Sequence, residues 1–331
     1  MHINELWESD ELSARLARIG LLPLAGLYAV GWEAYLATYR MGFKKAKAPH
    51  HPVLCVGNLV TGGAGKTPTT LFFARLLQEM GFEVVVGCSG YGGPHAEAAA
   101  IAPSGSLMAA EWGDEPAMMR WLYPDLPLVV GRRRVLAAEL VHGSFPSAVL
   151  VMDDGFQHLP LAKDITVLLD DPSPKNRLCL PAGPYREPRF NRKRADLVIP
   201  DRFRQVALPQ TFVDPEGSVV DLTGEYDVLC ALGQPARFLN ALKDRLKRPP
   251  TYALTLNDHD PMNGGTLLSP FQPSSFELGR PIVVTAKDWV KVRDRADVAN
   301  YRFVIAKHEI KLEPEAEMRQ WLASKLHERT A

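Results

Sequence analysis

Apolar runs and amphipathic segments alternate along most of the chain after residue 50. Continuous apolar runs without a polar face predict buried strands, and they cover 52–58, 82–89, 126–131, 147–154 and 164–171. Helical spacing of apolar residues predicts helices after the glycines near residue 65, at 114–122 and at 132–142. This rhythm predicts a mostly parallel, doubly wound α/β sheet that binds ligands at the carboxyl ends of its strands.

A second and smaller α/β unit is predicted nearer the C-terminus. Its expected strands are 227–232, 251–256, 281–285 and 302–307, with one helix around Leu242 and a last helix around Leu322. A strand at 195–200 is expected before this unit, in the preceding domain. Residues 178–194 read as a proline- and arginine-rich loop, and 201–225 as an irregular linker. We therefore expect an N-terminal segment at 1–48, a nucleotide-binding α/β domain at 49–215 and a C-terminal α/β domain at 216–331.

The N-terminal segment from Leu21 to Tyr39 is mostly apolar and aromatic, although Pro23, two glycines and Glu33 interrupt it. Basic residues follow directly: Arg40, Lys44, Lys45 and Lys47. This order is typical of an interfacial helix on a cytoplasmic membrane leaflet. A helix packed on the protein's own core has equal weight. The N-terminus begins with acidic residues rather than the basic residues of a signal peptide, so no signal peptide is expected.

Composition narrows the class of protein. The chain has 331 residues, 46% of them hydrophobic, with 38 basic and 38 acidic side chains. Zero formal charge argues against a general nucleic-acid binder. The four cysteines form no Cys-x-x-Cys pair, which favours a reducing cytosol over a disulfide framework or a zinc site.

A glycine-rich loop between the first buried strand and its helix has the parts of a phosphate-binding loop. Glycines let backbone N–H groups surround phosphate oxygens, Lys66 supplies charge, and Thr67 supplies a hydroxyl for Mg²⁺. The expected ATP-binding residues are Thr61, Gly62, Gly63, Ala64, Gly65, Lys66, Thr67 and Pro68. Val60 stands where the usual pattern has a glycine, so a chance glycine-rich turn is the alternative.

Two carboxylates, Asp153 and Asp154, follow the strand at 147–154. At the carboxyl end of a strand beside a phosphate loop, one of them can hold Mg²⁺ directly or through water. The alternative is an ordinary turn.

Asp114 in Gly-Asp-Glu-Pro has two interpretations of its own. It either caps a helix as the N-cap residue or serves as a general base for an attacking hydroxyl. The arginines after residue 185 are either a solvated face or a phosphate contact.

Taken together, the motifs resemble the tetraacyldisaccharide 4'-kinase family, the lipid A 4'-kinases of Gram-negative bacteria. The stretches that carry the resemblance run in order along most of the chain: LLPLAGLY, VGNLVTGGAGKTPTT, GYGG, GDEP, VGRRR, DDGFQHLPLAKDITVLL, LPAGPYREP, RADLVI, LGQPARF, NDHD and VTAKDWVK. The Val60 form of the loop, with its earlier glycine at Gly57, is itself the variant of that family.

The resemblance implies an ATP- and Mg²⁺-dependent kinase at the cytoplasmic face of the inner membrane. Its acceptor is the 4'-hydroxyl of a tetraacyl glucosamine disaccharide 1-phosphate, and its product is lipid IVA. Lys66 and Thr67 would serve the ATP phosphates, and Asp153 and Asp154 the metal. Asp114 would be the base, supported by His259. Further positions near the site would be Glu115, His158, Arg186 and Glu187. No protein or nucleic-acid partner is expected.

This chain departs from the family pattern at two places. Ser89 stands where the family commonly has an arginine, which removes one expected phosphate or substrate contact. The common Asp-His-His reads Asp258-His259-Asp260.

Two other functions remain open from the residues alone. A regulatory GTPase or partitioning-type ATPase needs a base-reading Asn-Lys-x-Asp segment. The nearest segment, Thr285-Ala286-Lys287-Asp288, has its lysine one place late, so guanine recognition is unsupported. A membrane-associated scaffold is the non-enzymatic alternative.

Overall fold

The computed structural model describes residues 3–63, 65–258, 260–262, 276–277 and 279–330. Its strands form a seven-stranded sheet of order β3-β4-β2-β5-β1-β6-β7, a five-stranded sheet of order β11-β10-β12-β13-β9 and a two-stranded sheet of β14 and β8. This is the mixed α/β fold with a large, mostly parallel sheet that the sequence predicts.

The chain folds as two compact units. The first unit contains 1–84, 142–206 and 312–331, and the second contains 85–141 and 207–311. The domain division predicted from the sequence, 1–48, 49–215 and 216–331, stays a prediction.

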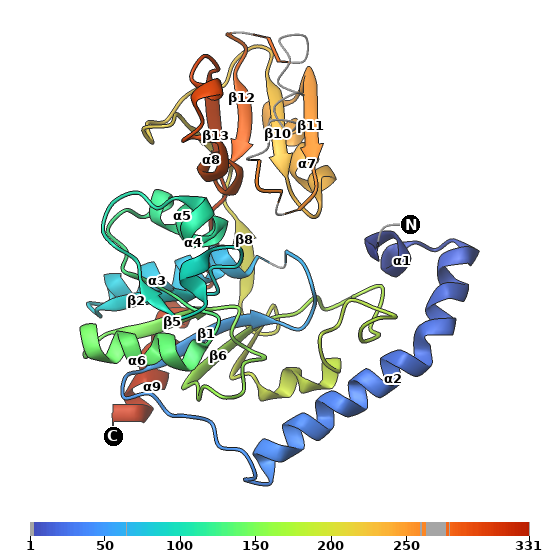
Figure 1. Ribbon diagram of the computed structural model, residues 1–331, viewed down its shortest axis with the longest axis vertical. Helices are drawn as coiled ribbons and strands as arrows, with labels where there is room; N and C mark the ends of the chain where they lie inside the picture. The colour runs from blue at the N-terminus through green and yellow to red at the C-terminus, as the bar shows by residue number, and fades with distance from the viewer. Residues whose placement is uncertain (1–2, 64, 259, 263–275, 278, 331) are drawn as a thin grey trace. The chain divides into compact units, whose positions relative to one another are not determined.

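Four parallel strands are the centre of the first unit (Figure 1): β5 (Val149–Asp153), β1 (Val53–Asn58), β6 (Ile165–Leu169) and β7 (Leu197–Ile199). Every residue of β1, β5 and β6 is buried, as expected for continuous apolar runs. Helix α3 (Lys66–Glu79) follows β1, and α9 (Glu315–Thr330) also belongs to this unit. Val56 of β1 is in register with Asp153, so the ends of β1 and β5 lie at the same sheet edge.

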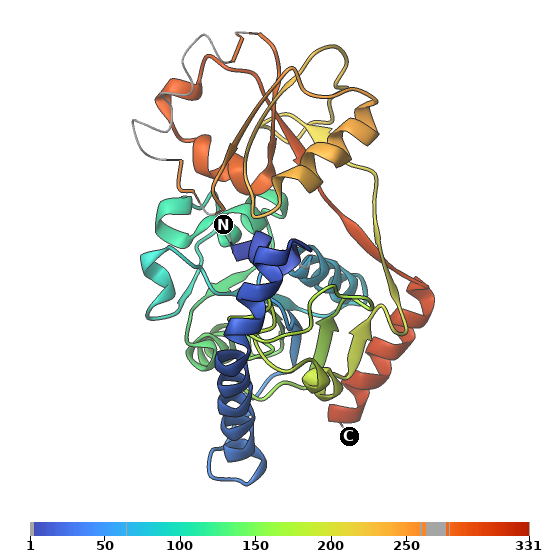
Figure 2. The same ribbon diagram turned by 90° about the vertical axis from the view of Figure 1, so that its right-hand side faces the viewer.

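Two N-terminal helices, α1 (Ile3–Glu8) and α2 (Leu12–Arg40), belong to the same unit (Figure 2). The predicted apolar segment lies inside α2, which continues through Pro23. By length and composition, α2 is long and apolar enough to cross a membrane, with a mean hydropathy of 1.3 in its most apolar window. Only 11% of that window is buried, so most of the helix is not packed on the protein's core.

The N-terminal part of the second unit contains β4 (Leu128–Val130), the short β3 (Ala100–Ile101) and β2 (Val84–Cys88) from its second residue onward. Strand β2 pairs in parallel with β4, and β3 pairs antiparallel to β4. The helices of this part are η1 (Pro94–Ala96), α4 (Ala109–Trp112), α5 (Asp114–Leu122) and α6 (Arg134–Ser144) up to Val141.

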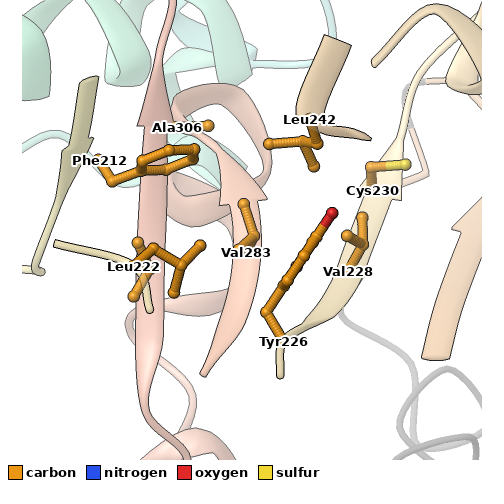
Figure 3. Close-up of a cluster of buried hydrophobic side chains, with 9 residues drawn as sticks. Phe212, Leu222, Tyr226, Val228, Cys230, Leu242, Val283 and Ala306 are labelled. Atoms are coloured by element: carbon orange, nitrogen blue, oxygen red, sulfur yellow. The ribbon is translucent and has the colours of Figure 1, made fainter. Parts of the chain in front are cut away.

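The five-stranded sheet is the centre of the rest of the second unit. Its strands are β11 (Tyr252–Leu256), β10 (Asp227–Ala231), β12 (Ile282–Thr285), β13 (Phe303–Lys307) and β9 (Thr211–Val213), and its helices are α7 (Pro235–Leu246), α8 (Ala286–Val292) and η4 (Ala296–Val298). All pairings are parallel except that of β9 with β13. Figure 3 shows its core, in which Tyr226, Val228 and Val283 pack with Leu242 of α7.

Two loop predictions need correction. The segment 201–225 is not an irregular linker, because it contains β8 (Arg204–Ala207) and β9. Strand β8 pairs with β14 (Ile310–Glu313), which the sequence pattern also missed. Strands β8 and β9 are short, and β8 has no buried residue, so neither strand gives an apolar run in the sequence. The loop at 178–194 ends in a 3₁₀ helix, η2 (Arg189–Arg194).

Candidate active site

The glycine-rich loop lies at the carboxyl end of β1 and leads directly into α3. Gly62 and Gly65 have φ angles of 103° and 80°, which L side chains rarely adopt, and Gly65 is the N-cap of α3. The Lys66 Nζ donates to the Gly62 carbonyl at 3.4 Å, so the lysine folds back over its own loop. Ala64 lies outside the described residues. Gly63 and Pro68 flank this turn, in the loop and in the first turn of α3.

Val60 has a packing role that explains why no glycine is needed there. It forms an isolated antiparallel bridge with Tyr185 and packs against the buried cluster around Leu59 and Tyr185. The next residue, Thr61, donates its N–H to the Pro184 carbonyl at 2.9 Å. The loop is therefore fixed on its N-terminal side by the proline-rich segment, and its turn is made by the later glycines.

Asp153, the last residue of β5, binds two hydroxyl groups of α3. Its Oδ2 accepts from Thr67 Oγ1 at 2.8 Å, and its Oδ1 accepts from Thr70 Oγ1 at 3.0 Å. Burial raises the pKa of the carboxyl group, and Asp154 adds to this, whereas the Thr67 and Thr70 hydroxyls and the Lys66 charge lower it. Thr70 lies one helical turn after Thr67, which is the signal by which it can be found in the sequence.

Asp154 is held by two cations. Arg186 makes a two-pronged contact with it, at 3.2 Å to Oδ2 and 2.9 Å to Oδ1, and Lys66 Nζ lies 3.7 Å from Oδ2. The residue has a φ of 49°, a conformation that aspartate tolerates better than most residues. Arg186 also hydrogen-bonds Asn58, the last residue of β1. The structure thus brings Lys66, Asp154 and Arg186 together at one sheet edge.

Glu187 is fully buried and lies between the sheet edge and α2. Its Oε1 accepts from Gln157 Nε2 at 2.9 Å, and its Oε2 accepts from Trp32 Nε1 at 2.9 Å and contacts Arg194. Tyr28 of α2 donates to the Arg186 carbonyl at 2.7 Å. The segment that carries Arg186 is therefore attached to α2. Gln157 and Trp32 were not singled out from the sequence.

His158 lies in the turn after β5. Its N–H donates to the Gly155 carbonyl at 3.0 Å, and its own carbonyl accepts from Lys163 Nζ at 2.8 Å. Burial lowers the pKa of Lys163. The role of His158 near a substrate stays a prediction.

In the second unit, Asp114 is the first residue of α5, and Gly113 before it is the N-cap. The carboxylate is mostly buried, and its Oδ1 accepts from the N–H of Glu115 at 2.9 Å. Its Oδ2 lies 3.4 Å from Lys287 Nζ and 3.8 Å from Lys291 Nζ. Asp114 is thus an ion-paired carboxylate rather than the N-cap residue itself. His259 lies outside the described residues.

Glycines bring the loop after β2 against the start of α5. A Cβ on Gly93 would lie 2.5 Å from the Trp112 carbonyl carbon, and one on Gly113 would lie 2.8 Å from the Tyr91 carbonyl oxygen. Backbone meets backbone here, which only glycine permits. The Gly-Tyr-Gly-Gly motif therefore positions Asp114, and Ser89 lies at the start of this loop.

The segment Thr285–Asp288, the one nearest to a guanine-reading motif, forms the start of α8. Thr285 is the N-cap of α8, and its Oγ1 accepts from the N–H of Asp288 at 3.1 Å. Asp288 is fully buried and accepts from Thr285 Oγ1 at 2.7 Å. An aspartate bound in this way is not available to read a purine base.

Oxygen donors gather where the phosphate loop meets β5. Thr67, Asp153 and Asp154 offer a hydroxyl and two carboxylates, the hard ligands that Mg²⁺ prefers. Among the described residues there is no group of three or more His, Cys, Asp or Glu side chains arranged to hold a metal ion.

Comparisons with known proteins agree with these motifs. The family model for LpxK, tetraacyldisaccharide-1-P 4'-kinase, matches residues 17–327. A tetraacyldisaccharide 4'-kinase of Shewanella baltica (strain OS185) is 33% identical over 313 residues, which cover 89% of this chain and 87% of the relative. One of Aromatoleum aromaticum is 31% identical over 325 residues, covering 91% and 92%.

A solved structure has the same fold. The crystal structure of the "apo" form of LpxK from Aquifex aeolicus in complex with ATP matches with a TM-score of 0.79 and 25% identity, covering 93% of this chain and 99% of that one. The family resemblance of the motifs is thereby confirmed: the chain belongs to the tetraacyldisaccharide-1-P 4'-kinase family.

Proposed function

We propose that the protein transfers the γ-phosphate of ATP to the 4'-hydroxyl of a tetraacyl glucosamine disaccharide 1-phosphate, which gives lipid IVA in lipid A biosynthesis. The observation that carries this proposal is the meeting of Lys66, Asp153 and Asp154 at the ends of β1 and β5, in a chain of this family.

The loop from Thr61 to Pro68 would bind the ATP phosphates. Lys66 Nζ lies 3.4 Å from the Gly62 carbonyl and 3.7 Å from Asp154, distances that are long for charge-assisted contacts. When ATP binds, Lys66 would exchange these two long contacts for shorter ones to phosphate oxygens. In such loops, the positive charge of the lysine stabilises the negative charge on the transferring phosphoryl group.

Mg²⁺ would be held by Thr67, Asp153 and Asp154. A bound Mg²⁺ neutralises charge on the phosphates. The protein's own contribution is to keep Asp153 in place, because two hydroxyls of α3 bind its two oxygens at 2.8 and 3.0 Å. Arg186 would do the same for Asp154 and would offer its remaining N–H groups to a phosphate.

Asp114 would accept the proton of the attacking 4'-hydroxyl, with His259 supporting it. The charges of the two lysines beside it favour the ionised form that a base requires, against the opposing effect of burial. Glu115, His158 and Glu187 would complete the surroundings of the substrate.

Helix α2 would hold the protein on the cytoplasmic face of the inner membrane. Exposed large apolar side chains lie along it: Leu12, Leu16, Ile19, Leu22, Leu24, Leu27 and Val30. Basic residues lie at its last position, Arg40, and after it, up to Lys47, and they suit anionic headgroups. An acylated acceptor is found at such a surface.

The test is transfer of label from γ-labelled ATP to the purified disaccharide 1-phosphate in detergent with Mg²⁺. We expect labelled lipid with the native protein and none with Lys66→Ala. ATP hydrolysis without labelled lipid would instead support a nucleotide switch, and neither activity would support the scaffold.

A further inference from the structure

Two lysines of α8 converge on the carboxylate of Asp114. Lys287 and Lys291 are one helical turn apart, so both lie on the face of α8 that packs on α5. Both ammonium groups lie near the same oxygen, Oδ2, at 3.4 Å and 3.8 Å, while Oδ1 accepts the N–H of Glu115. The two oxygens of Asp114 therefore have different partners.

Lys291 is itself fixed by a second carboxylate. Its side chain is only 3% exposed, and Nζ lies 3.4 Å from Oδ1 of Asp288. Asp288 is fully buried and is tied to Thr285 through both its N–H and its Oδ2. Burial raises the pKa of Asp288, and the Lys291 charge opposes this. The cap of α8 thus determines where the Lys291 charge lies.

Other charged groups around Asp114 come from several elements. Lys287 also lies 3.8 Å from Asp258, which follows β11. Glu115 follows Asp114 on α5, Glu111 of α4 is exposed, and His95 of η1 stacks on Trp112. Two cations therefore face Asp114 from α8, and each is shared with another carboxylate, Lys287 with Asp258 and Lys291 with Asp288.

We propose that Lys287 and Lys291 are positioning residues for the phosphoryl-transfer reaction: they keep Asp114 ionised and orient its Oδ2 toward the acceptor hydroxyl. The inference rests on the proposed role of Asp114 as the base. In that step the hydroxyl O–H bond breaks and its proton goes to Asp114. The oxygen forms a bond to the γ-phosphorus, and the bond from that phosphorus to the bridging oxygen of ADP breaks.

The test compares pH profiles of kcat for lipid labelling, from about pH 5 to pH 9. Removing Lys291 alone would leave Asp288 as an unpaired buried charge, so the comparison uses Asp288→Asn against Asp288→Asn/Lys291→Met. The double variant lacks one of the two cations beside Asp114, and we expect this loss to raise the pKa of that carboxyl group. We expect its acidic limb to lie higher by about one pH unit or more.

Below this limb, kcat falls roughly tenfold for each unit, because tenfold less Asp114 is ionised. The KM for ATP stays within about twofold, and Asp288→Asn/Lys291→Arg restores the profile of Asp288→Asn. A purely structural role would change Tm and leave the limb in place.

Lys287→Met provides a second measurement, because Lys287 is more exposed and faces the same oxygen. This variant decides the outcome if the double variant does not fold. We again expect the acidic limb of the pH profile to move to higher pH. Unmoved limbs, together with an inactive Asp114→Asn, would overturn the inference and leave the proposed base intact. An active Asp114→Asn would overturn the base role itself and the inference with it.

Discussion

The exposed apolar face of α2 gives a prediction whose size follows from the structure. Leu27 is 70% exposed although it is a large apolar side chain on a regular helix. If α2 lies in a membrane surface, replacing Leu27 with glutamine removes apolar area from the lipid. The folded protein loses little, because that side chain packs on little of it.

The magnitude comes from the area that Leu27 leaves to solvent. Full burial of a leucine side chain is worth about 2 kcal/mol, so the 70% that is exposed corresponds to about 1.4 kcal/mol. This free energy corresponds to about a tenfold change in a partition coefficient.

The assay is co-sedimentation of the detergent-free protein with phospholipid vesicles, zwitterionic and anionic. We expect Leu27→Gln to weaken binding to both kinds of vesicle. The matched control is Ala34→Ser, an exposed position of the same helix that offers little apolar area. Binding equal to that of the control, with an unchanged Tm, would refute insertion of this face.

Three further predictions concern single side chains. Lys66→Ala lowers the rate of lipid labelling by roughly 10³-fold or more without lowering Tm, and a rate near that of the native protein would place ATP elsewhere. Asp153→Asn abolishes labelling but raises stability at pH 8 by about 0.5–2 kcal/mol, since burial raises the pKa of Asp153 and its ionised form is unfavourable. The gain disappears as the pH falls through that pKa, where native Asp153 is protonated; a lower Tm at pH 8 would contradict this. Burial raises the pKa of Cys179 to about 11 and of Cys230 to about 12, so a disulfide reagent at pH 8 labels the native protein slowly and the unfolded protein quickly.

The buried strands of the large sheet could be predicted because each is a continuous apolar run. The ends of β1 and β5 followed from the same runs, and with them the neighbourhood of Lys66, Asp153 and Asp154. Strand β8 could not be predicted, since none of its residues is buried and only its pairing with β14 makes it a strand.

The residues that hold the candidate site in place were harder to find than those proposed to do its chemistry. Asn58 contacts Arg186, and Gln157 contacts Glu187. The two residues of each pair lie far apart in the sequence, so no local spacing links them. Lys287 and Lys291 were readable as an i, i+4 pair, but their target lies more than 170 positions earlier in the chain. Long-range pairing of this kind is visible only in the structure.

The central claim is phosphoryl transfer to one hydroxyl of an acylated disaccharide. It is tested most directly with γ-labelled ATP, Mg²⁺ and two acceptors, the tetraacyl disaccharide 1-phosphate and its 4'-deoxy counterpart. We predict stoichiometric label on the first acceptor and none on the second. Equal labelling of both acceptors, or of neither, would contradict the claim.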